Sequence, residues 1–137
     1  MLHRNEKVEL IKRVPLFAGG SKKELEQIAQ IADEIDLREG KEMTTQGSRG
    51  REFFVLLEGE ADVIKDGTSI NRLGPGDFFG EIALVSDSPR TATVTATSPV
   101  RALVITDRSF KRLLDDQPEF QRKVLVELAE RLAPNHL

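Results

Sequence analysis

The sequence predicts a mainly β fold, an antiparallel jelly-roll β-barrel with helices before and after it in the chain. Between residues 34 and 106, short apolar runs alternate with glycines at near-regular intervals. No run in this region is long enough for a helix between two strands, so parallel βαβ units are excluded. An antiparallel β-sandwich is the alternative to the barrel. The expected strands are Glu34–Arg38, Glu42–Thr45, Glu52–Leu57, Ala61–Lys65, Ser69–Leu73, Thr91–Thr97 and Val100–Thr106.

Residues 1–33 are expected to form an N-terminal helical portion. Apolar residues at helical spacing precede Pro15, which should stop the first helix. Ser21 and Glu24 have the spacing of a capping box, and they open a second helix. The favoured role of this portion is core packing. The apolar stripe of the second helix is Leu25, Ile28, Ala29 and Ala32.

Within the barrel, Lys65-Asp66-Gly67-Thr68 predicts a tight hairpin, because Asp-Gly tolerates positive φ angles. Two further helices are expected over residues 107–133. Asp107 can cap the first of them, and Pro118 suits the first position of the second. Pro134 is expected to end the chain's last helix. The apolar stripe of that helix is Phe120, Val124, Leu125, Leu128 and Leu132.

Composition excludes several classes of function. The chain of 137 residues fits one domain, and its net charge of −3 argues against a nucleic-acid polymer as partner. It contains no cysteine, so disulfides, zinc–thiolate clusters and thiol nucleophiles are excluded. No apolar run reaches membrane-spanning length, and the N-terminus lacks a signal-peptide core. The expected location is the cytoplasm.

Enzymatic function has little support in the sequence. The two histidines, His3 and His136, lie near the ends of the chain, and the expected strands have none. A metal enzyme of the cupin type would need histidines on its strands. No nucleophile can be placed beside a general base. We therefore predict no catalytic residue, no metal ligand and no cofactor.

The segment Gly76–Ala96, GDFFGEIALVSDSPRTATVTA, carries the chemistry that suggests a ligand. A short helical turn beginning at Gly80 would present unpaired N–H groups, which favour an anion. Glu81 can accept hydrogen bonds from hydroxyl groups, and Arg90 offers a rigid fork of donors to phosphate oxygens. Together these groups suggest a ribose phosphate. The alternative is an ordinary Glu–Arg surface pair beside a turn.

The order Phe79-Gly80-Glu81-Ile82-Ala83-Leu84, five residues, then Arg90-Thr91-Ala92 resembles the phosphate-binding cassette of cyclic nucleotide-binding domains. That family includes the catabolite activator protein and the regulatory subunit of protein kinase A. The resemblance implies that Glu81 takes the ribose 2′-hydroxyl and Arg90 the exocyclic phosphate oxygens, with cAMP favoured over cGMP. The ligand-binding residues that it implies are Phe79, Gly80, Glu81, Ile82, Ala83, Arg90, Thr91 and Ala92.

Several of the candidate ligand contacts have two interpretations each. The apolar strand residues Val63 and Leu73 could contact the base, although core filling is favoured for them, as it is for Val55, Leu57 and Val94. Thr91 does not decide between cAMP and cGMP, because family members of both preferences carry this residue type. Arg131 could stack on the base from the C-terminal lid helix, as in some family members, but a solvated surface arginine is the favoured interpretation.

The predicted function is a cyclic-nucleotide sensor whose C-terminal helices move when the ligand binds. A degenerate cassette serving as an interaction or dimerisation module is the first alternative, and a cupin-like enzyme is the second. The sequence contains no recognisable output segment, so we expect either a domain that works alone or a fragment of a longer protein, with any output domain or partner outside this chain. Homodimerisation is left open.

Overall fold

The computed structural model describes residues 4–136, and its side chains from residue 6 to residue 131. His3 and the side chains of Leu132 and His136 lie outside this description. The helices are α1 (Arg4–Arg13), α2 (Lys22–Ile31), α3 (Glu81–Ser86), α4 (Asp107–Asp116) and α5 (Pro118–His136). The strands are β1 (Asp33–Leu37), β2 (Glu42–Thr44), β3 (Glu52–Glu58), β4 (Ala61–Lys65), β5 (Thr68–Leu73), β6 (Phe78–Phe79), β7 (Thr93–Ala96) and β8 (Val100–Thr106).

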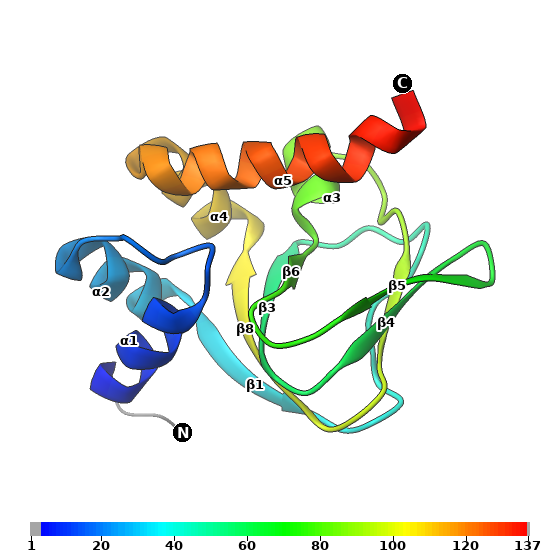
Figure 1. The fold of residues 1–137 in the computed structure, drawn as a ribbon, viewed down its shortest axis with the longest axis horizontal. Coiled ribbons are helices and arrows are strands. Elements are labelled where there is room, and N and C mark those ends of the chain that lie inside the picture. The colour runs from blue at the N-terminus through cyan, green and yellow to red at the C-terminus, as the bar shows by residue number, and fades with distance from the viewer. Residues whose placement is uncertain (1–3, 137) are drawn as a thin grey trace.

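The strands form two four-stranded sheets, ordered β1-β8-β3-β6 and β2-β7-β4-β5, with every pair antiparallel. Figure 1 shows α1 and α2 on one side of the barrel, while α4 and α5 lie across one end of it. The predicted fold class, mainly antiparallel β with flanking helices, is confirmed. None of the helices in the described part of the chain is long and apolar enough to cross a membrane.

Strand β3 divides the apolar core in two, because alternate residues of a strand point to opposite faces. Phe54 and Leu56 pack between the two sheets. Phe53 and Val55 pack on the other side, against the helices. One continuous apolar run therefore contributes to both cores, which is typical of a strand buried on both faces.

An aromatic cluster fixes α5 against the barrel. The ring of Phe120 on α5 lies 5.7 Å from Phe17 and 6.4 Å from Phe53, measured between centroids. Phe110 on α4 stacks on Phe53 at 4.6 Å. Buried Gln117, between the two helices, donates to the carbonyl of Glu24 and so ties them to α2. These contacts set the direction in which α5 crosses the end of the barrel.

Several local expectations are confirmed. Ser21 and Glu24 form the reciprocal capping box. Asp66 and Gly67 have φ angles of 52° and 79°, as a tight hairpin requires. Pro118 opens α5, which is the position that a proline tolerates best in a helix.

Other expectations are wrong. Strand β6 was not predicted, because two residues are too few to show a period. The side chain of Thr106, rather than that of Asp107, caps α4 by accepting from the N–H of Ser109. The last helix does not end at Pro134 but continues to His136. It changes direction near its C-terminal end (Figure 1), which is how a helix accommodates a proline without ending.

Candidate functional site

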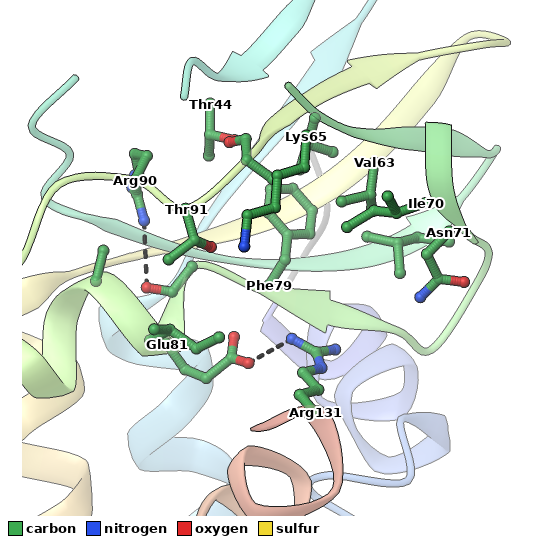
Figure 2. Close-up of a pocket in the computed structure, with 16 residues that line it drawn as sticks. Thr44, Val63, Lys65, Ile70, Asn71, Phe79, Glu81, Arg90, Thr91 and Arg131 are labelled. Atoms are coloured by element: carbon green, nitrogen blue, oxygen red, sulfur yellow. Dashed lines mark hydrogen bonds and ion pairs between the residues drawn. The ribbon is translucent and has the colours of Figure 1, made fainter. Parts of the chain in front are cut away.

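A pocket of about 340 Å³ lies between the β4–β5 hairpin, α3, the segment before β7, and α5. Every residue implied by the cassette resemblance lines it, from Phe79 to Ala83 and from Arg90 to Ala92. Val63, Leu73 and Arg131 line it too. Figure 2 shows Arg90 and Thr91 on one side of the pocket and Glu81 facing Arg131 on another. The cassette and the candidate base contacts therefore surround a single space.

Arg90 is only 5% exposed, and backbone carbonyls hold its guanidinium. Nη2 donates to the carbonyl of Glu52 at 2.6 Å, and Nη1 donates to the carbonyl of Gly80 at 3.2 Å. The Glu52 carboxylate lies 3.6 Å from Nη2. Burial lowers the pKa of Arg90 from its ordinary value, while the carboxylates of Glu52 and Glu81 act in the opposite direction. The guanidinium is thus fixed in place before any anion reaches it.

The Arg90 side chain occupies space that a Cβ atom at Gly50 or Gly80 would fill. A Cβ on Gly50 would lie 2.0 Å from Nε of Arg90, and a Cβ on Gly80 would lie 2.9 Å from its Nη1. Gly80 also has a φ of 99°, which a residue with a side chain rarely adopts. It directly precedes the first turn of α3, where backbone N–H groups lack partners within the helix. The start of α3 is thereby placed at the pocket beside the guanidinium.

Glu81 is fully buried, at 0% exposure. One carboxylate oxygen, Oε1, accepts a hydrogen bond from Arg131, whereas Oε2 has no hydrogen-bond partner among the described residues. Burial raises the pKa of Glu81 above its ordinary value, and the charge of Arg131 opposes this shift. A buried acceptor without a donor costs about 1–3 kcal/mol. A hydrogen-bond donor placed at Oε2 would remove this cost.

The surface-pair alternative for Glu81 and Arg90 is wrong, since both side chains are buried and each is held by other groups. The surface interpretation of Arg131 is wrong as well. Its side chain is 26% exposed and donates to Glu81, to Glu127 and to the carbonyl of Phe78. The guanidinium carbon also lies 5.0 Å from the centroid of the Phe78 ring. These contacts exist because α5 crosses the end of the barrel above α3 (Figure 1).

Sequence reasoning missed four lining residues, Thr44, Lys65, Ile70 and Asn71. Of the apolar strand residues that it weighed, Val94 lines the pocket, whereas Val55 and Leu57 pack against the helices. The alternation of side chains along β4 could have indicated Lys65, because residues two apart on a strand point to the same face and Val63 was already a candidate. Where side chains are described, no group of three or more His, Asp or Glu residues is placed to hold a metal ion.

Comparison with known proteins identifies the family. Residues 34–117 match the model of the cyclic nucleotide-binding domain. The chain belongs to this family. The domain is 40% identical over 113 residues to the cAMP-dependent protein kinase regulatory subunit of Mycosarcoma maydis, a match that covers 74% of this chain and 21% of that protein. This cyclic nucleotide-binding domain thus spans about a fifth of the length of that relative.

Solved structures have the same fold. The regulatory domain of Toxoplasma gondii PKA, crystallised with cAMP, is 25% identical with a TM-score of 0.81, covering 93% of this chain and 50% of that one. The regulatory subunit of a cAMP-independent protein kinase A from Trypanosoma brucei is 21% identical with a TM-score of 0.82, covering 95% of this chain and 46% of that one. Since both proteins share the fold, the fold of this cyclic nucleotide-binding domain does not decide its ligand. The side chains in the pocket must do so.

Proposed function

We propose that this domain binds a cyclic nucleotide, cAMP ahead of cGMP, and acts as a regulatory sensor. The observation that carries the proposal is the buried carboxylate of Glu81. This side chain lines the pocket, and its Oε2 has no hydrogen-bond donor among the described residues. A ribose 2′-hydroxyl supplies one donor and fits this need. The M. maydis and T. gondii relatives are described with cAMP, which makes it the first ligand to test.

The phosphate would be held on the opposite side of the same pocket. Arg90 supplies a guanidinium fixed by two backbone carbonyls, and the start of α3 supplies N–H groups and the positive end of a helix dipole. A cyclic phosphate diester carries one negative charge, and one buried arginine balances it. The pocket therefore offers a positive charge where the phosphate would lie and a hydrogen-bond acceptor where the ribose hydroxyl would lie.

Arg131 provides the connection between the ligand and the C-terminal helices. It reaches from α5 to the carboxylate that would hold the ribose. A change in the position or charge of the Glu81 carboxylate would therefore alter a direct contact of α5. This supports a response in which α4 and α5 move, with the output passed to a domain or partner outside this chain and with no catalytic step. The cytoplasmic location remains a prediction from the sequence, and homodimerisation stays open.

One observation favours the second candidate, an interaction module without a ligand. Arg90 already donates to two carbonyls, and Glu81 already pairs with Arg131. Such protein contacts could replace a lost nucleotide. The unpaired Oε2 of Glu81 argues against it, because a site that had become purely structural would gain stability by losing that oxygen.

Titration calorimetry with cAMP and cGMP tests the proposal, using protein refolded from denaturant so that no carried-over nucleotide remains. Arg90→Ala should weaken binding by about 1.5–3 kcal/mol, the range for hydrogen bonds to charged groups, or roughly 10–150-fold. Glu81→Ala should weaken binding while the domain stays folded. Arg112→Ala, an exposed arginine on α4, is the matched control and should bind normally. No heat from the folded wild-type protein with either nucleotide would favour the interaction module.

A further inference from the structure

The loop between β2 and β3 (residues 45–51) holds two sides of the ligand pocket, although none of its residues lines that pocket. We propose that Gln46 is a positioning residue, which fixes the tip of the β4–β5 hairpin relative to residues 90–92 and so sets the width of the pocket. This inference rests on the proposed function, because it concerns the affinity of the same site. Gln46 acts from outside the pocket, through the residues that it holds.

The tip of the β4–β5 hairpin projects from the barrel (Figure 1). Strand β7 begins at Thr93, whose partner on β4 is Ile64, and the ladder between β7 and β4 ends there. Residues 65–68, which form the tip, extend beyond this ladder, and Lys65 among them lines the pocket. Since a two-stranded ribbon is only marginally stable by itself, the position of this side of the pocket depends on what else holds the tip.

Gln46 holds the tip through a reciprocal pair of hydrogen bonds. Its Nε2 donates to Oδ1 of Asp66 at 2.8 Å, and its Oε1 accepts from the backbone N–H of Asp66 at 2.9 Å. Asp66 occupies the turn itself, with a φ of 52°, so both bonds reach the far end of the hairpin. Apart from the pairing of β4 with β5, these are the hydrogen bonds that connect residues 65–68 to other described residues. The Gln46 amide thus holds the tip where the β7 ladder has ended.

The backbone of the same loop pairs with the residue that would bind the phosphate. The N–H of Gly47 donates to the carbonyl of Arg90 at 2.9 Å, and the N–H of Arg90 donates to the carbonyl of Ser48 at 2.8 Å. The N–H of Gln46 donates to Oγ1 of Thr93 at 2.9 Å. These bonds fix the backbone at Gln46 relative to Arg90, while the Gln46 side chain holds the hairpin tip. The separation of the two sides of the pocket is therefore set through this one residue.

Loss of the Gln46 contact should weaken every nucleotide by the same factor. A ligand would then have to order the hairpin tip as it binds, and this cost lowers the affinity without removing any contact to the ligand. Neither Gln46 nor Asp66 lines the pocket, so the cost does not depend on which nucleotide binds. We expect the affinities for cAMP and cGMP to fall together, by about three- to tenfold.

The experiment measures the affinities of cAMP and cGMP by calorimetry on wild-type protein and on three variants. Gln46→Met removes both hydrogen bonds without changing the charge, and it should weaken both nucleotides by about three- to tenfold. The double variant Gln46→Glu with Asp66→Asn exchanges the amide and the carboxylate, so both hydrogen bonds and the net charge are kept. Its affinities should lie within about twofold of wild type, and asparagine tolerates the positive φ of this position. Gln30→Met replaces an exposed glutamine on α2 and should change neither affinity.

Three results would overturn the inference while leaving the proposed function intact. They are normal affinities in Gln46→Met, a loss confined to one nucleotide, and a double variant that binds as weakly as Gln46→Met. A folded wild-type protein that binds neither nucleotide would instead overturn the proposed function, and this inference with it.

Melting curves verify that each variant is folded. If Gln46→Met does not fold, Asp66→Gly tests the same contact from the hairpin, because glycine adopts the positive φ and lacks Oδ1. The same loss for both nucleotides is then expected, and normal affinities would overturn the inference.

Discussion

Replacing Gly50 by alanine should displace the Arg90 guanidinium, although Gly50 itself does not line the pocket. The new Cβ would lie 2.0 Å from Nε and 2.4 Å from Cζ of Arg90, so the guanidinium must move. The backbone at Gly50 does not have a positive φ, so alanine brings no conformational strain of its own. Gly74 is the matched control, because a Cβ there meets nothing within 4 Å and its φ is not positive either.

The expected size follows from the bonds at risk. Arg90 makes two hydrogen bonds to carbonyls, each worth about 1.5–3 kcal/mol for a charged donor. If the displaced guanidinium keeps one of them, Gly50→Ala should lose about 1.5–3 kcal/mol in the free energy of unfolding. At roughly 3–5 °C per kcal/mol for a chain of this size, the melting temperature should fall by about 5–15 °C.

Calorimetric titration should show the affinity for cAMP falling as it does for Arg90→Ala, and thermal melting should show the lost stability. Gly74→Ala should match the wild-type protein in both assays. If Gly50→Ala bound cAMP normally and melted together with Gly74→Ala, the geometry assigned to Arg90 would be refuted.

Two further predictions concern the ion pair between Glu81 and Arg131. Because burial raises the pKa of Glu81, stability that is fully present below about pH 4.5, its ordinary value, is lost as the pH rises through the raised pKa. Denaturant unfolding should show Glu81→Gln gaining stability relative to the wild-type protein across this window, and a constant difference at all pH values would contradict it. Arg131→Met leaves a buried carboxylate unpaired and should cost about 1–3 kcal/mol, less than for a fully buried pair because Arg131 is 26% exposed. Arg122→Met, on the exposed side of the same helix, should cost little, and equal costs for the two variants would argue against the pair.

The cassette could be predicted from the sequence because its chemistry is local. Glu81 and Arg90 lie nine positions apart in one continuous segment, so their roles follow from residue types and spacing. The capping box at Ser21 and the Asp66-Gly67 hairpin are local in the same sense. Each depends on the conformational preferences of a few neighbouring residues, which the sequence displays directly.

The contacts that the sequence did not reveal depend on tertiary placement. Arg131 lies 50 residues from Glu81, and it reaches the pocket only because the packing of Phe120 sets the direction of α5. On a helix considered alone, the same arginine is an ordinary polar residue. Ile70 and Asn71 face the pocket together only because β4 and β5 shift register by one residue. No residue type in these strands predicts that bulge.

The two carboxylate oxygens of Glu81 have different partners, and this difference decides how a ligand and α5 would influence each other. If Arg131 occupied both oxygens, a ribose hydroxyl would have to displace it, and binding would loosen α5. Arg131 instead occupies Oε1 and leaves Oε2 without a donor, so a hydroxyl can be added while the ion pair remains. A donor at Oε2 favours the ionised carboxylate, and the ionised carboxylate strengthens the pair with Arg131. Because such coupling is reciprocal, a ligand that satisfies Glu81 should hold α5 more firmly over the pocket, and a firmly held α5 should tighten binding by the same factor.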